Sequence, residues 1–146
     1  MNRYGEMRNR QQKEFDALPL GFAFSKRQFA EVMQQWGLDP ETDIDKIQSI
    51  GFGGFIQKKD AGLLHQTRNR HDTELEAAIA GDKTGDGFIY EMFLCELDNH
   101  EYGYTRDADG ALDALCYTME EVQADERLLR GFLKACKEIT GRSANR

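Results

Sequence analysis

Residues 88–99 read FIYEMFLCELDN, a strongly apolar stretch that follows a glycine-rich loop. We interpret it as a buried helix. A buried strand competes at this length, because the periodicity of a short apolar run does not separate the two.

Helix signals flank the stretch on both sides. On its N-terminal side, Asp60 is placed to cap a long polar helix that ends near Gly81. On its C-terminal side, Thr118 and Glu121 have the spacing of a capping box. Asp125 is placed to cap the last helix. Further helices are predicted at 4–18, 25–37 and 107–115.

The predicted fold is mainly α, with five to six helices and one small β-hairpin near 47–58. Two short strands flank the turn Gly51-Phe52-Gly53-Gly54, and residues 18–24 are expected to be extended. An α+β fold stays open because of this hairpin. The turn lacks the spacing of a phosphate-binding loop. We expect residues 1–141 to form a single globular domain and residues 142–146 a flexible tail.

Composition narrows the class of protein. The chain has 146 residues, of which 40% are hydrophobic and 31% charged, as in folded globular proteins. No apolar run approaches the roughly 20 residues that cross a bilayer. The first residues are polar and basic and do not form a signal peptide. We therefore expect a cytoplasmic protein that does not contact membranes, and the sequence does not indicate its oligomeric state.

Acidic charge is concentrated in one part of the chain. Residues 71–126 hold sixteen acidic and two basic residues, a net charge of −14, while both ends of the chain are basic. A solvated surface is the simpler interpretation, but this charge exceeds what solubility needs. Folded acidic faces attract basic clefts. We predict a protein partner with a basic cleft, bound through Asp107, Asp109, Asp113, Glu120, Glu121, Asp125 and Glu126.

Direct nucleic-acid binding is the opposing hypothesis. The basic ends of the chain would supply phosphate contacts, and residues 112–122 resemble two helices joined by a tight turn, as in a helix-turn-helix. The second of these helices, however, begins with Glu120 and Glu121, which would face phosphates. We therefore do not expect the chain to bind nucleic acid.

The loop before residues 88–99 resembles the first eight positions of an EF-hand calcium loop. Asp82, Thr84 and Asp86 occupy its first, third and fifth positions. The twelfth position should be a bidentate Glu, and it is Phe93. The simpler interpretation is a polar turn in which Asp86 caps the following helix. No cofactor is expected, and a Ca²⁺-binding module is the alternative function.

No catalytic centre is evident. The chain has no GxSxG motif, and its cysteines, Cys95, Cys116 and Cys136, lie in apolar patterns that disfavour a thiolate. An enzyme of unknown class ranks third. Four phenylalanines near loops form either an exposed contact patch or, in the favoured interpretation, the ends of the core. They are Phe22, Phe24, Phe52 and Phe55.

Four stretches carry a resemblance to a family of short uncharacterised proteins from mobile elements of Gram-positive gut bacteria. They are LPLGFAFS at 18–25, QWGLDPETDIDKIQSIGFGGFI at 35–56, DKTGDGFIYEMFLCELDNHEYGYT at 82–105 and ALDAL at 111–115. The resemblance implies a genomic setting in which small acidic inhibitors, such as anti-CRISPR proteins, disarm host defence. It carries over no site residues.

Overall fold

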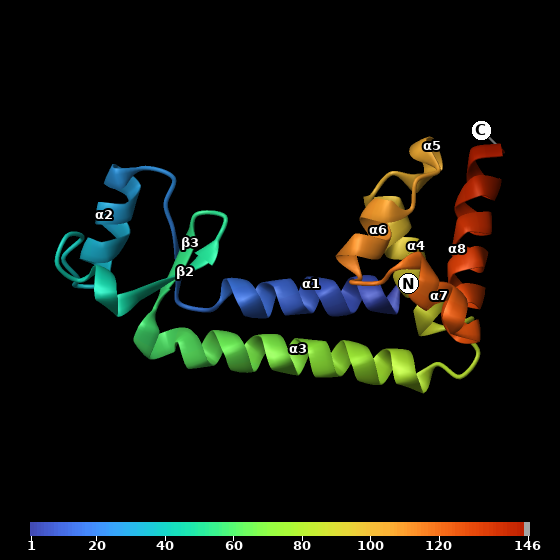
Figure 1. The fold of residues 1–146 in the computed structure, drawn as a ribbon, viewed down its shortest axis with the longest axis horizontal. Helices are drawn as coiled ribbons and strands as arrows, with labels where there is room; N and C mark the ends of the chain where they lie inside the picture. The colour runs from blue at the N-terminus through green and yellow to red at the C-terminus, as the bar shows by residue number, and fades with distance from the viewer. Residues whose placement is uncertain (145–146) are drawn as a thin grey trace. The chain divides into compact units, whose positions relative to one another are not determined.

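The computed structural model describes residues 1–144. Within that part, the chain forms eight α-helices and one three-stranded antiparallel sheet (Figure 1). The prediction of a mainly α fold with a small β-hairpin is therefore confirmed. Among these residues, no helix is both long enough and apolar enough to cross a lipid bilayer.

The chain divides into two compact units. The helical unit comprises residues 1–10 and the chain from residue 73 onward, and the sheet unit comprises residues 11–72. The single domain expected at 1–141 stays a prediction. Of the tail predicted at 142–146, residues 142–144 belong to the last helix, and residues 145–146 lie outside the described residues.

Most helices and strands begin and end within two residues of the predicted positions. The buried helix predicted at 88–99 is confirmed as α4, and the competing strand is wrong. The helices are α1 (Arg3–Asp16), α2 (Lys26–Gln35), α3 (Ala61–Gly81), α4 (Phe88–Asn99), α5 (Tyr102–Thr105), α6 (Asp109–Ala114), α7 (Met119–Ala124) and α8 (Glu126–Ala144). The strands are β1 (Leu20–Phe22), β2 (Ile47–Gly51) and β3 (Gly54–Gln57).

The core of the helical unit lies between α4 and α8, which run side by side (Figure 1). Ile89, Met92 and Phe93 of α4 are fully buried. The Phe93 ring meets the Phe132 ring of α8 edge-on, with the ring centroids 5.5 Å apart. Each fully buried side chain of this kind contributes about 1.5–3 kcal/mol to stability. The apolar stretch quoted above therefore forms the centre of this unit.

Two glycines let the loop before α4 touch α8. Gly85 has a φ of +92°, and a Cβ atom there would lie 2.1 Å from the carbonyl oxygen of Arg127. On α8, a Cβ atom at Gly131 would lie 2.6 Å from the side chain of Ile89. A residue with a side chain does not fit either contact without a shift of the backbone. The loop is thus fixed against α8.

The caps predicted for the last two helices are present. The Thr118 hydroxyl accepts a hydrogen bond from the Glu121 N–H at 3.1 Å, and the Glu121 carboxylate accepts one from the Thr118 N–H at 3.0 Å. The Asp125 carboxylate accepts hydrogen bonds from the N–H groups of Arg127 and Leu128 at 2.9 and 3.3 Å. Such caps stabilise a helix by roughly 0.5–2 kcal/mol.

The sheet unit has its own small core. Its strands are ordered β1-β3-β2, and α2 packs against β1. The Phe55 ring of β3 contacts Phe29 and Trp36, with the ring centroids 5.2 Å apart in both pairs. A Cβ atom at Gly21 of β1 would lie 2.7 Å from Val32, so the glycine lets α2 approach closely. The predicted hairpin is confirmed, and the segment predicted only as extended supplies the third strand.

Candidate functional site

In the first half of the acidic stretch, residues 71–100, four of the eight acids pair with arginines of the same unit. The Glu91 carboxylate accepts a hydrogen bond from Arg3 Nε of α1 at 2.7 Å. On α8, Arg130 donates to Asp86 at 2.8 Å. Further pairs are Arg10 with Glu74 and Arg142 with Asp98. The basic ends of the chain therefore neutralise acidic residues within the fold.

The second half of the stretch differs. We call residues 101–126 the acidic segment; it holds eight acidic residues and one basic residue, Arg106. Within residues 1–144, Asp125 is the only one of these eight acids in an ion pair with a lysine or arginine, and its partner Arg127 lies 3.4 Å away. The segment comprises α5, α6, α7 and the first residue of α8. Its negative charge is left for solvent or a partner.

The seven predicted binding residues all belong to this segment, but they do not have the same role. Asp125 is half-buried and the other six are exposed. Three of the seven hold local structure: Asp107 accepts a hydrogen bond from the Asp109 N–H at 2.9 Å, and Glu121 and Asp125 are the caps described above. The side chains without a hydrogen bond to any described residue are those of Asp109, Asp113, Glu120 and Glu126.

The loop predicted as a calcium site is organised by Asp82. Its Oδ1 accepts hydrogen bonds from the N–H groups of Thr84 and Gly85 at 3.2 and 3.0 Å, and its Oδ2 from those of Gly87 and Ile89 at 3.1 and 3.0 Å. Burial acts to raise the pKa of Asp82, but these four donors outweigh it and hold the pKa below its usual value. Asp82 therefore stabilises the turn into α4.

Asp86 does not cap α4, contrary to the prediction. Its carboxylate faces Arg130 instead, and this hydrogen bond keeps the pKa of Asp86 below its usual value. The third predicted ligand, Thr84, uses its hydroxyl to accept a hydrogen bond from the Asp86 N–H at 3.1 Å. Asp82 takes this place because its carboxylate accepts hydrogen bonds from the N–H groups of Gly87, just before α4, and of Ile89 in its first turn.

Arg127 completes the attachment of this loop to α8. Its Nη1 donates to the carbonyl oxygens of Ile79 and Asp82 at 3.0 and 2.8 Å. In the described part of the chain, no three His, Cys, Asp or Glu side chains form a group suited to holding a metal ion. Calcium binding at this loop stays a prediction, and the contacts observed are those of a structural turn.

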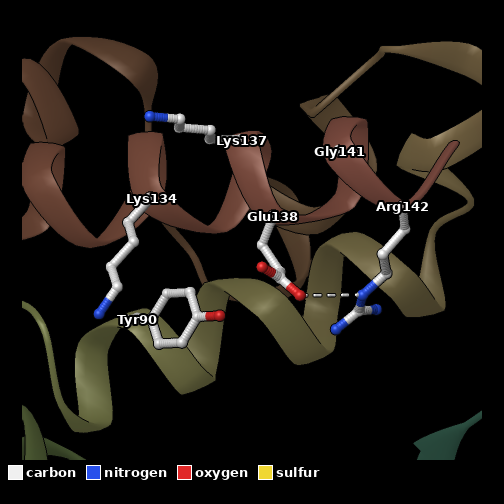
Figure 2. Close-up of a pocket in the computed structure, with 6 residues that line it drawn as sticks. All are labelled: Tyr90, Lys134, Lys137, Glu138, Gly141 and Arg142. Carbon is white, nitrogen blue, oxygen red and sulfur yellow. Dashed lines mark hydrogen bonds and ion pairs between the residues drawn. The ribbon is translucent and has the colours of Figure 1, made fainter. Parts of the chain in front are cut away.

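A groove of about 370 Å³ runs between α4 and α8 (Figure 2). Lys134 Nζ lies 4.4 Å from the centroid of the Tyr90 ring, and Arg142 donates to Glu138 at 3.3 Å. Figure 2 shows Lys137 pointing away from Tyr90 on the other side of α8. Sequence reasoning missed this groove, although Lys134, Glu138 and Arg142 follow one another at i, i+4 spacing. Of its charged groups, Glu138 and Arg142 pair with each other one turn apart on α8.

The cysteines offer no activated nucleophile. Cys95 and Cys136 are half-buried, and burial raises the pKa of both thiols, so they stay protonated at neutral pH. Cys116 is exposed, which corrects the prediction that it lies in an apolar face. It occupies the left-handed region of the backbone, with a φ of +60°, just after α6.

The four phenylalanines do not share one environment. Phe55 is buried, as favoured, but Phe22, Phe24 and Phe52 are exposed by 51%, 79% and 98%. The favoured interpretation, that all four close the core, is therefore wrong for three of them. We call these three residues the aromatic tip. They belong to the sheet unit, away in sequence from the acidic segment.

The comparison with known proteins gives a family and no function. The profile of a family of unknown function, DUF7659, matches residues 3–138. The chain belongs to DUF7659. No curated protein and no solved structure matches it. The match begins at the first residue of α1 and ends within α8, so residues of both units of this DUF7659 member belong to the family's common sequence.

Proposed function

We propose that this DUF7659 member is a non-enzymatic protein that binds the basic cleft of a partner protein through its acidic segment. One observation carries the proposal. Arginines of α1 and α8 pair with acids in the first half of the acidic stretch, whereas Asp109, Asp113, Glu120 and Glu126 have no partner among the described residues. The fold supplies arginines to four of the eight acids of residues 71–100, but to one of the eight acids of the acidic segment, whose remaining charge is left to attract cations from outside.

The mechanism follows from the electrostatics. Exposed like charges in one segment repel one another and lower the stability of the fold. A partner whose cleft is lined by Lys and Arg relieves this repulsion, and the opposite charges accelerate the encounter of the two proteins. The Asp and Glu carboxylates of the acidic segment take the places that nucleic-acid phosphates occupy in such a cleft. The bound chain then blocks access of the nucleic acid.

The partner class is a nucleic-acid-binding protein, because such proteins carry basic clefts built for a polyanion. In the genomic setting that the sequence resemblance implies, the partner is a host defence protein, and the chain inhibits it. Direct binding of nucleic acid is disfavoured, because four arginines at the basic ends of the chain are engaged with acids of the helical unit: Arg3, Arg10, Arg130 and Arg142.

The test reverses charge without removing caps. Asp113→Lys, Glu120→Lys and Glu126→Lys alter exposed acids that have no hydrogen bond to described residues, and they spare Glu121 and Asp125. The matched control makes the same change of charge in the sheet unit, with Glu41→Lys, Asp45→Lys and Asp72→Lys. These three acids are also exposed.

Each tagged protein is used to capture partners from a bacterial lysate, and elution in steps of rising salt is followed by mass spectrometry. The wild type and the control should retain a basic nucleic-acid-binding protein that leaves as salt screens the charges. The affinity of the acidic-segment variant for that purified protein should fall by about tenfold or more. Equal retention by all three proteins would contradict the proposal.

A further inference from the structure

The β2–β3 hairpin has an unusual residue at its tip. Phe52 and Gly53, the two central residues of the turn, have φ values of +53° and +78°. This pattern belongs to a type I′ turn, in which Asn or Asp before Gly is favoured. A bulky residue in the left-handed region is strained. The strained position therefore holds an apolar side chain that packs on nothing and is 98% exposed.

The other two rings of the aromatic tip are placed by glycines. A Cβ atom at Gly53 would lie 2.6 Å from the Phe24 ring, and a Cβ atom at Gly54 would lie 3.0 Å from the Phe22 ring. The Ala23 N–H donates to the Gly53 carbonyl oxygen at 2.9 Å, which ties the segment after β1 to the turn. The rings thus rest on a bare backbone and present their other sides to solvent.

Charge limits what the aromatic tip can bind. Residues 17–30 and 47–57, which form the tip and its surroundings in sequence, contain the cations Lys26 and Arg27. Arg27 pairs with Glu31, one turn further along α2, at 3.2 Å. Two cations on a chain of net charge −7 are too few to hold a polyanion such as nucleic acid or an anionic bilayer. The tip is complementary to a surface that combines apolar groups with carboxylates.

The chain itself carries such a surface. In the acidic segment, Tyr104 is 83% exposed near Glu101 and Asp107 in sequence, and Met119 is 37% exposed next to Glu120. We infer that the partner of the aromatic tip is a second copy of this chain, whose acidic segment receives the tip. Lys26 of one copy then faces the carboxylates of the other, beside the Arg27–Glu31 ion pair, and Phe52 is covered.

The expected association is weak. Stable protein interfaces bury about 800 Å² on each partner, which three exposed rings do not reach alone. One contact leaves a second tip and a second acidic segment free, so the copies form either a closed pair with two contacts or a longer chain. This inference does not depend on the proposed function, because it involves no other protein. It implies that self-association and binding of a basic partner compete for the acidic segment.

The experiment is sedimentation velocity of the purified full chain, from about 10 μM to about 1 mM, at low and high salt. The wild type should associate as its concentration rises, and less so at high salt. Phe52→Asn should weaken association by at least about tenfold, because an exposed anchor is lost while the turn gains a favoured residue. Phe52→Tyr, which keeps the ring, should associate like the wild type.

A charge swap identifies the two surfaces. Lys26→Glu with Arg27→Glu, and the Asp113→Lys, Glu120→Lys, Glu126→Lys variant, should each be monomeric alone and should associate when mixed. A wild type that stays monomeric at every concentration overturns the inference. So does association that is unchanged by Phe52→Asn, or tip-dependent binding of single-stranded DNA or anionic vesicles by a monomer.

Discussion

The helical unit and the sheet unit differ in what they expose to solvent: the first exposes acidic side chains and the second exposes aromatic rings. The helical unit has a net charge of −6, packs most of its large apolar side chains into or against its core, and exposes seven of the eight acids of its acidic segment. The sheet unit has a net charge of −1 and exposes three phenylalanines. The unpaired carboxylates of the helical unit favour electrostatic contacts, and the exposed rings of the sheet unit favour apolar contacts.

Glycine shows the same contrast. In the helical unit, Gly85 and Gly131 let a loop and a helix meet at backbone distance, and this closeness fixes the core. In the sheet unit, Gly53 and Gly54 support rings that face solvent. Gly85 and Gly131 therefore contribute to the stability of the helical unit, whereas Gly53 and Gly54 hold the rings of the aromatic tip in contact with solvent. Substitutions at these sites therefore separate the two roles.

The largest effect is expected for Gly85→Ala. The new Cβ atom would lie 2.1 Å from the Arg127 carbonyl oxygen, in a backbone region that disfavours side chains. Unfolding by urea should show a loss of about 3 kcal/mol or more. The control is Gly141→Ala in α8, where no atom lies within 4 Å of the new Cβ, and which should gain about 0.5–1 kcal/mol. Similar stabilities for both variants would show that the loop does not hold the unit together.

The next effect is the acid sensitivity of the helical unit. The pKa of Asp82 is lowered in the fold, so this carboxylate contributes stability above its unfolded pKa of about 4 and loses it as pH falls through the folded value. Melting temperatures should decline below about pH 4. Asp82→Asn should melt lower at pH 7 and decline less steeply on acidification. If its curve runs parallel to that of the wild type, the hydrogen bonds of Asp82 do not carry this dependence.

The smallest effect has the opposite sign. Phe52→Asn places the favoured residue in the type I′ turn and should raise stability by roughly 0.5–1 kcal/mol in urea unfolding. The matched change Gly53→Ala meets the Phe24 ring at a φ of +78° and should lower it. A loss of stability in Phe52→Asn would mean that the ring packs on the fold and is not held out for a partner.

Local signals were sufficient to predict much of the fold. The apolar run of α4 and the caps at Thr118 and Asp125 depend on residues within one or two helical turns, and all three predictions are confirmed. The cap assigned to Asp86 failed because Asp82, four residues earlier, reaches the same N–H groups through the Gly85 turn. Which N–H groups a carboxylate reaches depends on how the loop is folded, and the sequence spacing alone does not show this.

Tertiary pairing explains what the sequence did not predict about the site. Arg3 and Glu91 are 88 residues apart, and their ion pair depends on the packing of α1 against α4. Such pairs decide which acids of residues 71–126 stay free, so the predicted set included both caps and free carboxylates. The exposure of Phe52 depends on a positive φ that no sequence pattern indicates.

Displacement of nucleic acid from the captured partner shows whether the acidic segment occupies the basic cleft. The partner is loaded with a fluorescent oligonucleotide, and the wild type, the acidic-segment variant and the sheet-unit control are titrated in. We expect stoichiometric release by the wild type and the control, and release by the variant only at about tenfold higher concentration or more. A ternary complex that holds the oligonucleotide and the wild-type chain together would show that the acidic segment does not occupy the basic cleft.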